Sequence, residues 1–220
     1  MTTAVWTWKP LSPHEVELGV DALYAGVNGY GLSHRARDRD RLTAPSFVYG
    51  ETLAATFFRA MESVKPTADD HFLDLGSGIG RAAVLALLGL PVHKVTGIEY
   101  LSDLHEAACE ARRRLPIALG ELNGALDARR AEALDFIQGS FLETALDTAT
   151  LVFTVNAVFE PALNIALAHK LSGLALGARV VSVGQPLSSL ELEPVTQFSA
   201  DMGWGESAVF TYLRSASRAS

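Results

Sequence analysis

The sequence is poor in cysteine, in basic residues relative to acidic ones, and in long apolar runs. The single cysteine, Cys109, excludes an internal disulfide and a cysteine-rich metal site, so no metal centre is expected. The formal net charge of −7 argues against broad contact with nucleic-acid phosphates. No apolar run reaches the length of a membrane span, and residues 1–10 lack a charged-then-apolar signal pattern. We therefore expect no membrane association and a cytoplasmic or nuclear location.

The length of 220 residues and the apolar content of 49% fit one well-buried domain with a short appendage. We expect an N-terminal helix with a lid or linker (1–46), a main domain (47–214) and a tail (215–220). Ser12, Pro13 and Glu15 form a capping box that predicts a helix over Ser12–Tyr24. Residues Ala25–Ser46 show no apolar period, which favours an irregular segment, either a solvated linker or a mobile lid or docking loop.

The stretch His71–Gly80 organises the main domain. An apolar strand ends near Asp74, glycines follow at alternate positions, and the apolar run after Gly80 predicts a helix. Glycines in such a turn let the backbone approach a ligand, and the following helix offers free N–H groups. A nucleoside-bearing cofactor is therefore expected here, in preference to a turn that only joins two elements.

Two cofactor classes compete for this turn, a dinucleotide and S-adenosylmethionine. The dinucleotide fingerprint fits poorly, because its last position falls on Arg81 or Ala83 instead of glycine. Asp74 decides more, since its carboxylate would lie close to the loop that must hold a pyrophosphate. S-adenosylmethionine carries an ammonium and a sulfonium and no phosphate. The sequence thus favours S-adenosylmethionine, with S-adenosylhomocysteine as the product.

Three further segments supply candidates for cofactor contacts. A strand over His93–Tyr100 ends with Glu99, about twenty residues after the glycines, where an acid accepts hydrogen bonds from ribose hydroxyls. A short strand over Asp135–Gln138 precedes Ser140 and Phe141, which suit an adenine, although a phenylalanine there is usually core. The helix expected over Phe47–Lys65 opens with Tyr49-Gly50-Glu51-Thr52, a candidate clamp on the amino-acid end of the cofactor. Helices are also expected over Asp103–Leu115 and Gly120–Leu134.

The second half of the chain predicts the centre and one edge of the sheet. Thr148–Asn156 is an apolar strand for the sheet centre, which would place Asn156 and Phe159 at the reacting end. A helix over Pro161–Leu171 and a strand over Ala178–Val183 follow. Val195–Asp201 and Glu206–Leu213 alternate as two antiparallel strands, which makes Trp204 and Tyr212 candidates for the substrate entrance. This pattern is typical of a Rossmann-like class I methyltransferase with a seven-stranded, mostly parallel sheet.

Taken together, the segments VYGET, FLDLGSGIGRAAV, GIEY, QGSF, LVFTVNAVFEPAL and FTYL resemble the disruptor-of-telomeric-silencing type (non-SET) histone lysine methyltransferases. The likeness covers Phe47 to Leu213 and implies an S-adenosylmethionine-dependent methyltransferase domain. The sequence departs from the family pattern at Ala157, which replaces a second asparagine, and at Thr211, which replaces an aromatic residue. The basic segment of a nucleosome-binding member is absent.

The resemblance implies methyl transfer to a lysine amine of a basic protein. By motif, the residues that would hold the cofactor are Thr52, Asp74, Gly76, Gly78, Glu99, Ser140 and Phe141, to which we add Tyr49, Glu51, Ser77, Tyr100 and Asn156. Those that would shape the lysine channel are Asn156, Phe159 and Tyr212. Two alternatives remain open, a small-molecule N- or O-methyltransferase and a cofactor-binding subunit without catalysis.

Overall fold

The chain folds around one mixed sheet of seven strands, seen in the computed structural model, which describes residues 10–121 and 129–216. The strand order is β3-β2-β1-β4-β5-β7-β6; β7 runs antiparallel to both of its neighbours, β5 and β6, and the other pairings are parallel. The bounds are β1 (His71–Leu75), β2 (Lys94–Glu99), β3 (Leu134–Gln138), β4 (Leu151–Val155), β5 (Arg179–Val183), β6 (Leu192–Met202) and β7 (Gly205–Arg214). This confirms the predicted sheet, with β4 at its centre and the β6–β7 hairpin at one edge.

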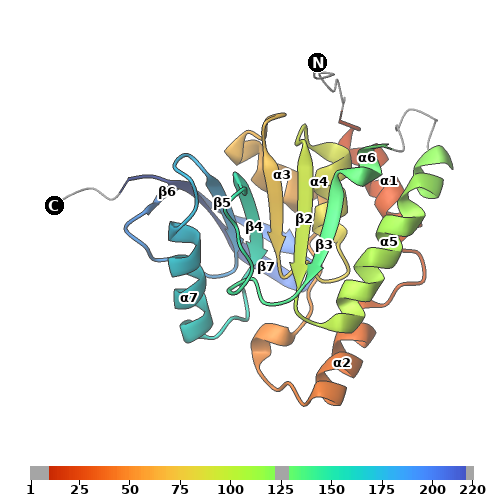
Figure 1. Cartoon of the computed structure of the whole chain (residues 1–220), viewed down its shortest axis with the longest axis horizontal. Helices are drawn as coiled ribbons and strands as arrows, with labels where there is room; N and C mark the ends of the chain where they lie inside the picture. The colour runs from red at the N-terminus through yellow and green to blue at the C-terminus, as the bar shows by residue number, and fades with distance from the viewer. Residues whose placement is uncertain (1–9, 122–128, 217–220) are drawn as a thin grey trace.

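Helices cover both faces of the sheet (Figure 1). Their bounds are α1 (Pro13–Leu23), α2 (Gly29–Asp40), the short 3₁₀ helix η1 (Pro45–Phe47), α3 (Ala54–Val64), α4 (Arg81–Gly89), α5 (Ser102–Glu121), α6 (Arg129–Glu132) and α7 (Pro161–Ser172). One apolar core joins α1, α3, α4 and α5 to the sheet, and a second lies on the side of α7. No helix among the described residues is both long and apolar enough to cross a membrane.

The predicted N-terminal helix is confirmed as α1, with its capping box in place. The backbone N–H of Glu15 donates to Ser12 Oγ over 3.4 Å, and the N–H of Ser12 donates to Glu15 Oε2 over 2.9 Å. The apolar face of α1 buries Val16, Val20 and Leu23 in the larger core. This helix is therefore part of the folded unit and not a separate appendage.

The prediction of an irregular segment over residues 25–46 is wrong, because α2 occupies most of it. Asn28 caps this helix by accepting the Gly31 N–H over 2.9 Å. Its buried face consists of Gly29, Ser33 and Ala36, which are small residues at helical spacing. A contact face built from small residues leaves no apolar period in the sequence, which explains the error. Figure 1 shows α2 beyond the carboxyl ends of the strands.

Two other helix boundaries also differ from the prediction. Residues 48–53 are not helical, so Tyr49, Glu51 and Thr52 lie in an extended segment before α3 and not at its start. Helix α5 continues through Pro116 to Glu121, beyond the predicted end at Leu115. Of the helix predicted over Gly120–Leu134, α6 accounts for four residues, Leu134 belongs to β3, and residues 122–128 lie outside the described chain.

Candidate cofactor and acceptor site

A cavity of about 460 Å³ lies at the carboxyl ends of the central parallel strands, where open α/β sheets bind their ligands. Residues 46–52 form one wall, and the turn after β1, the end of β2 and the segment after β4 form the others. The lining residues are Tyr30, Ser46, Phe47, Val48, Tyr49, Gly50, Glu51, Thr52, Asp74, Gly76, Ser77, Gly78, Arg81, Ala82, Glu99, Tyr100, Leu101, Leu104, Ser140, Phe141, Phe153, Val155, Ala157, Val158, Phe159, Leu163 and Trp204.

The glycine turn lies against the end of β2. The N–H of Gly78 donates to Glu99 Oε2 over 2.8 Å, and the N–H of Leu101 donates to Glu99 Oε1 over 2.8 Å. Gly78 has a φ of +56°, and a Cβ added there would come within 2.4 Å of the Tyr49 ring. Both the backbone angle and the space therefore require glycine at this position.

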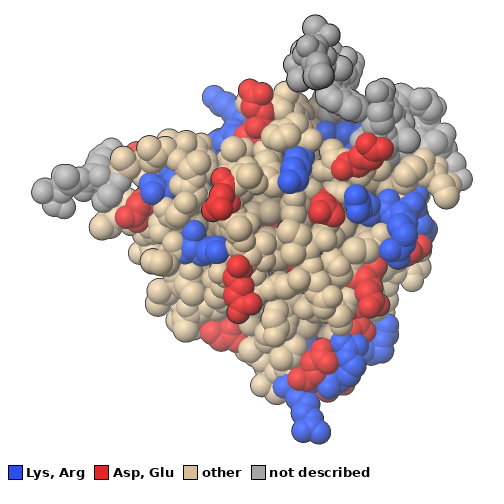
Figure 2. Space-filling view, in the orientation of Figure 1, with Lys and Arg blue, Asp and Glu red and all other residues tan. Residues whose placement is uncertain are grey.

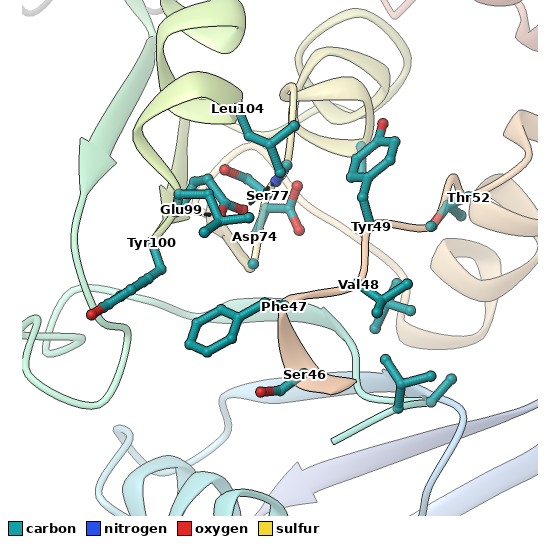
Figure 3. Close-up of a pocket in the computed structure, with 18 of the residues that line it drawn as sticks. Ser46, Phe47, Val48, Tyr49, Thr52, Asp74, Ser77, Glu99, Tyr100 and Leu104 are labelled. Atoms are coloured by element: carbon teal, nitrogen blue, oxygen red, sulfur yellow. Dashed lines mark hydrogen bonds between the residues drawn. The ribbon is translucent and has the colours of Figure 1, made fainter. Parts of the chain in front are cut away.

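Two buried acids face the cavity side by side, as Figure 3 shows. Burial, assisted by the neighbouring Glu99 carboxylate, raises the pKa of Asp74 to about 8. Burial also raises the pKa of Glu99, although the N–H groups of Leu101 and Gly78 act in the opposite direction. Buried carboxyls with raised pKa values are destabilising in their ionised form unless a cation or hydrogen-bond donor joins them.

Two polar atoms in this part of the cavity have no hydrogen-bond partner among the described residues. Asp74 Oδ2 and Ser77 Oγ are buried, and neither makes a hydrogen bond within the described residues. Buried polar groups in proteins are nearly always satisfied, so these atoms indicate a ligand. A cation would satisfy Asp74, and Gly78 keeps the backbone free of a side chain beside it. These residues fit S-adenosylmethionine, which carries an ammonium and a sulfonium, better than a diphosphate.

The wall formed by residues 46–52 is fixed by contacts to two other segments and by a hydrogen bond within the wall. The Phe47 ring packs on Tyr100 with centroids 5.3 Å apart, and Tyr49 donates to Glu51 Oε1 over 3.1 Å. Trp204, at the tip of the β6–β7 hairpin, lies so close to Gly50 that an added Cβ would meet its ring at 2.8 Å. Sequence reasoning missed Phe47 and Val48, because only the fold brings this wall over the ends of β1 and β2.

The cavity brings together all of the predicted site residues except Asn156 and Tyr212. The sequence places Tyr212 in the channel, but the structure buries it in the core on the side of α7. There its Oη accepts the Leu187 N–H over 2.8 Å. The reason is strand direction. β7 is antiparallel, and Tyr212 pairs with Val180 near the start of β5, away from the edge that holds the cavity.

Asn156 follows β4 at the correct edge, but its side chain does not line the cavity. Its Nδ2 donates to Asn164 Oδ1 over 2.6 Å and to the Gln185 carbonyl over 2.9 Å. Its Oδ1 accepts from Ser182 Oγ and from the Gln185 N–H, each over 3.0 Å. The amide therefore joins the segment after β4 to the segment after β5.

The strand order, the antiparallel β7 and the cavity at the glycine turn define a class I methyltransferase fold. Solved structures with this fold include an RNA methyltransferase from Salinibacter ruber, with a TM-score of 0.57 and 24% identity over 74% of this chain and 93% of that one. A geranyl diphosphate C-methyltransferase from Streptomyces coelicolor A3(2) has a TM-score of 0.56 and 14% identity over 94% of this chain and 100% of that one.

Within this class, the model of the family described as "Histone methylation protein DOT1" matches residues 39–201, more than half of the chain. The chain therefore belongs to the DOT1 family.

The relatives are much longer proteins named "Histone-lysine N-methyltransferase, H3 lysine-79 specific". The one from Drosophila melanogaster is 31% identical over 141 residues, which are 61% of this chain and 7% of the relative. The one from Debaryomyces hansenii is 27% identical over 154 residues, which are 69% of this chain and 13% of the relative. The chain thus spans only a small part of the relatives that it matches.

Proposed function

We propose that this chain is an S-adenosylmethionine-dependent methyltransferase that acts on a lysine amine of a basic, histone-like protein. The observation that carries the proposal is the buried Asp74 carboxyl beside the glycine turn, whose Oδ2 has no hydrogen-bond partner among the described residues, in a chain of the DOT1 family. When bound, the cofactor supplies an electrophilic methyl group. The protein's part is to bind both reactants, orient them and exclude water.

The cofactor contacts follow from the positions of the lining residues. Asp74 would face the ammonium of the amino-acid end, and Glu99 would accept the ribose hydroxyls. Ser140 and Phe141 would flank the adenine. The remaining candidates for the cofactor walls are Tyr49, Glu51, Thr52, Gly76, Ser77, Gly78 and Tyr100.

The acceptor side is supported by the stretch from the end of β4 to the first turn of α7, which contributes only apolar side chains to the cavity. These are Val155, Ala157, Val158, Phe159 and Leu163, and Phe159 stacks on Phe141 with ring centroids 5.9 Å apart. A lysine amine has a solution pKa of about 10.4 and must lose its proton before it can attack. An apolar wall favours the neutral amine, because desolvation penalises the charged form.

Asn156 would act through this segment and not by touching the substrate. Its four hydrogen bonds fix the backbone between β4 and α7 relative to Gln185 and Ser182. We therefore assign it the role of a positioning residue for Phe159 and its neighbours.

The charged side chains on the protein surface suit a basic protein partner better than nucleic acid. On the face shown in Figure 2, acidic and basic side chains alternate over α5 and α2 and form no continuous basic surface. The net charge of −7 acts in the same direction by attracting a cationic partner. A histone-like acceptor is compatible with the cytoplasmic or nuclear location expected from the sequence.

Cofactor affinity is expected to rise with pH up to about pH 8 and then to level. The Asp74 pKa of about 8 keeps this carboxyl mainly protonated at neutral pH, whereas a bound cation favours the ionised form. Binding should therefore release a proton, and each unit of pH below 8 should lower affinity by up to about tenfold.

Isothermal titration at pH 6 to 9, in two buffers of different ionisation enthalpy, measures both the affinity and the released proton. The ligand's own amino group, whose pKa is about 7.7–8.0, also titrates in this range. The same series with Asp74→Asn measures that contribution alone, so that it can be subtracted from the wild-type result. An identical pH dependence in the two proteins would contradict the role given to Asp74.

The activity is tested by incubating the protein with radiolabelled S-adenosylmethionine and separate pools of histones, other cell proteins and metabolites. Label in the protein pools, located on lysine by mass spectrometry and absent with Asp74→Asn, supports the proposal. Label confined to metabolites would instead indicate a small-molecule methyltransferase. Cofactor binding without any methylated product would indicate a subunit that lacks catalysis.

A further inference from the structure

The cavity contains a cationic side chain that the roles above do not use. Arg81, the first residue of α4, is the one arginine, lysine or histidine among the lining residues. Its Nη2 donates to Asp21 Oδ1 of α1 over 3.0 Å, and its guanidinium carbon lies 5.5 Å from the Tyr24 ring centroid. Its Nε is buried and makes no hydrogen bond to any residue that the structure describes.

Arg81 and Asp74 flank the same glycine turn from opposite ends. Between them, Tyr24, which follows α1 directly, donates to the Ile79 carbonyl over 2.9 Å and holds the turn against the end of that helix. An α-amino acid presents an ammonium and a carboxylate a few bonds apart. A cavity with an unpartnered carboxylate oxygen on one side and an unpartnered guanidinium N–H on the other matches both groups.

We propose that Arg81 binds the carboxylate of the cofactor's amino-acid end and that Asp21 is the residue that positions its guanidinium. The inference rests on the cofactor assigned under the proposed function. Helix α1 (Pro13–Leu23) lies outside residues 39–201, which match the family model. The positioning of this arginine is thus a contribution that the N-terminal helix of this chain makes to the cofactor site.

Orientation, and not charge, is what Asp21 supplies. Its side chain is 63% exposed, so solvent screens its charge, while its hydrogen bond fixes one end of a long and flexible side chain. If Asp21 acted only by neutralising Arg81, its removal would strengthen carboxylate binding. If it positions Arg81, its removal weakens carboxylate binding.

The test compares two ligands that differ only in this carboxylate, S-adenosylmethionine and decarboxylated S-adenosylmethionine, by isothermal titration. The wild type should prefer the first by about 10- to 100-fold, the usual contribution of a charge-assisted hydrogen bond. Arg81→Met should abolish the preference and leave the affinity for the decarboxylated ligand nearly unchanged, while Arg81→Lys should retain part of it. Asp21→Ala should lower the preference several-fold, and Asp21→Glu should restore it.

Arg112→Met is the matched control, because Arg112 of α5 forms an exposed ion pair with Asp135 of β3 and does not line the cavity. An Arg81→Met protein that keeps the preference, or that loses both ligands equally, would overturn the role of Arg81. A stronger preference in Asp21→Ala would overturn the positioning role. A wild-type protein that binds neither ligand would instead refute the proposed function.

Discussion

Replacing Asp74 by asparagine is expected to weaken S-adenosylmethionine binding about 100-fold while it raises the thermal stability of the ligand-free protein. The first effect follows from the loss of a buried negative charge opposite a cationic ligand, worth about 2.7 kcal/mol at that ratio. The second follows because burial raises the pKa of Asp74 from 3.8 to about 8, so this carboxyl lowers the stability of the folded state progressively between those two pH values and by its full amount above pH 8. Opposite changes in binding and stability mark a residue kept for function.

Titration calorimetry and thermal unfolding at pH 8.5 measure the two effects on the same samples. Asp69→Asn is the control, because Asp69 is exposed and lies before β1, at the far end of that strand. The stabilisation of Asp74→Asn should shrink at pH 6, where the wild-type carboxyl is protonated. A variant that loses both stability and binding would show that Asp74 supports the fold and not the ligand.

The largest effect on folding is expected from Phe57→Ala, which should cost about 3–5 kcal/mol of unfolding free energy. Phe57 of α3 is fully buried, and its ring centroid lies 5.9 Å from Phe72 of β1 and 5.5 Å from Phe153 of β4. These contacts hold α3, and with it the wall over the cavity, on the centre of the sheet. A loss of this size is a large part of the 5–15 kcal/mol that stabilises a typical domain.

Urea unfolding measures the loss, with Phe58→Ala as the matched control. Phe58 is the next residue of the same helix, but it is only partly buried. We expect its removal to cost well under half as much. Equal losses for the two variants would contradict the account of how α3 is held.

Most of the sheet could be predicted from the sequence because its strands are apolar and end in turn residues. The stretch from His71 to Gly80 predicts β1, the glycine turn and the start of α4, as observed. Helix α2 could not be found by apolar periodicity, since its buried face is made of small residues. The spacing of Gly29, Ser33 and Ala36 is the pattern that indicates it.

The candidate site could be predicted where each residue lies at, or shortly after, the carboxyl end of a parallel strand. Asp74, Glu99 and Phe141 are such residues, and all three line the cavity. Tyr212 is different, because it lies on an antiparallel strand, and the sequence does not show near which edge of the sheet a given residue of such a strand lies. Arg81 was missed for another reason, since its pairing with α1 joins segments that are 60 residues apart.

The central claim is that an acidic glycine turn binds a cationic sulphur nucleoside and rejects a diphosphate. It is tested most directly by a crystal structure of the protein grown with S-adenosylhomocysteine and a nicotinamide dinucleotide together. We expect adenosylhomocysteine in the cavity, its ribose hydroxyls on Glu99 and its ammonium on Asp74. A dinucleotide there, with its pyrophosphate on the turn at Gly78, would contradict the account.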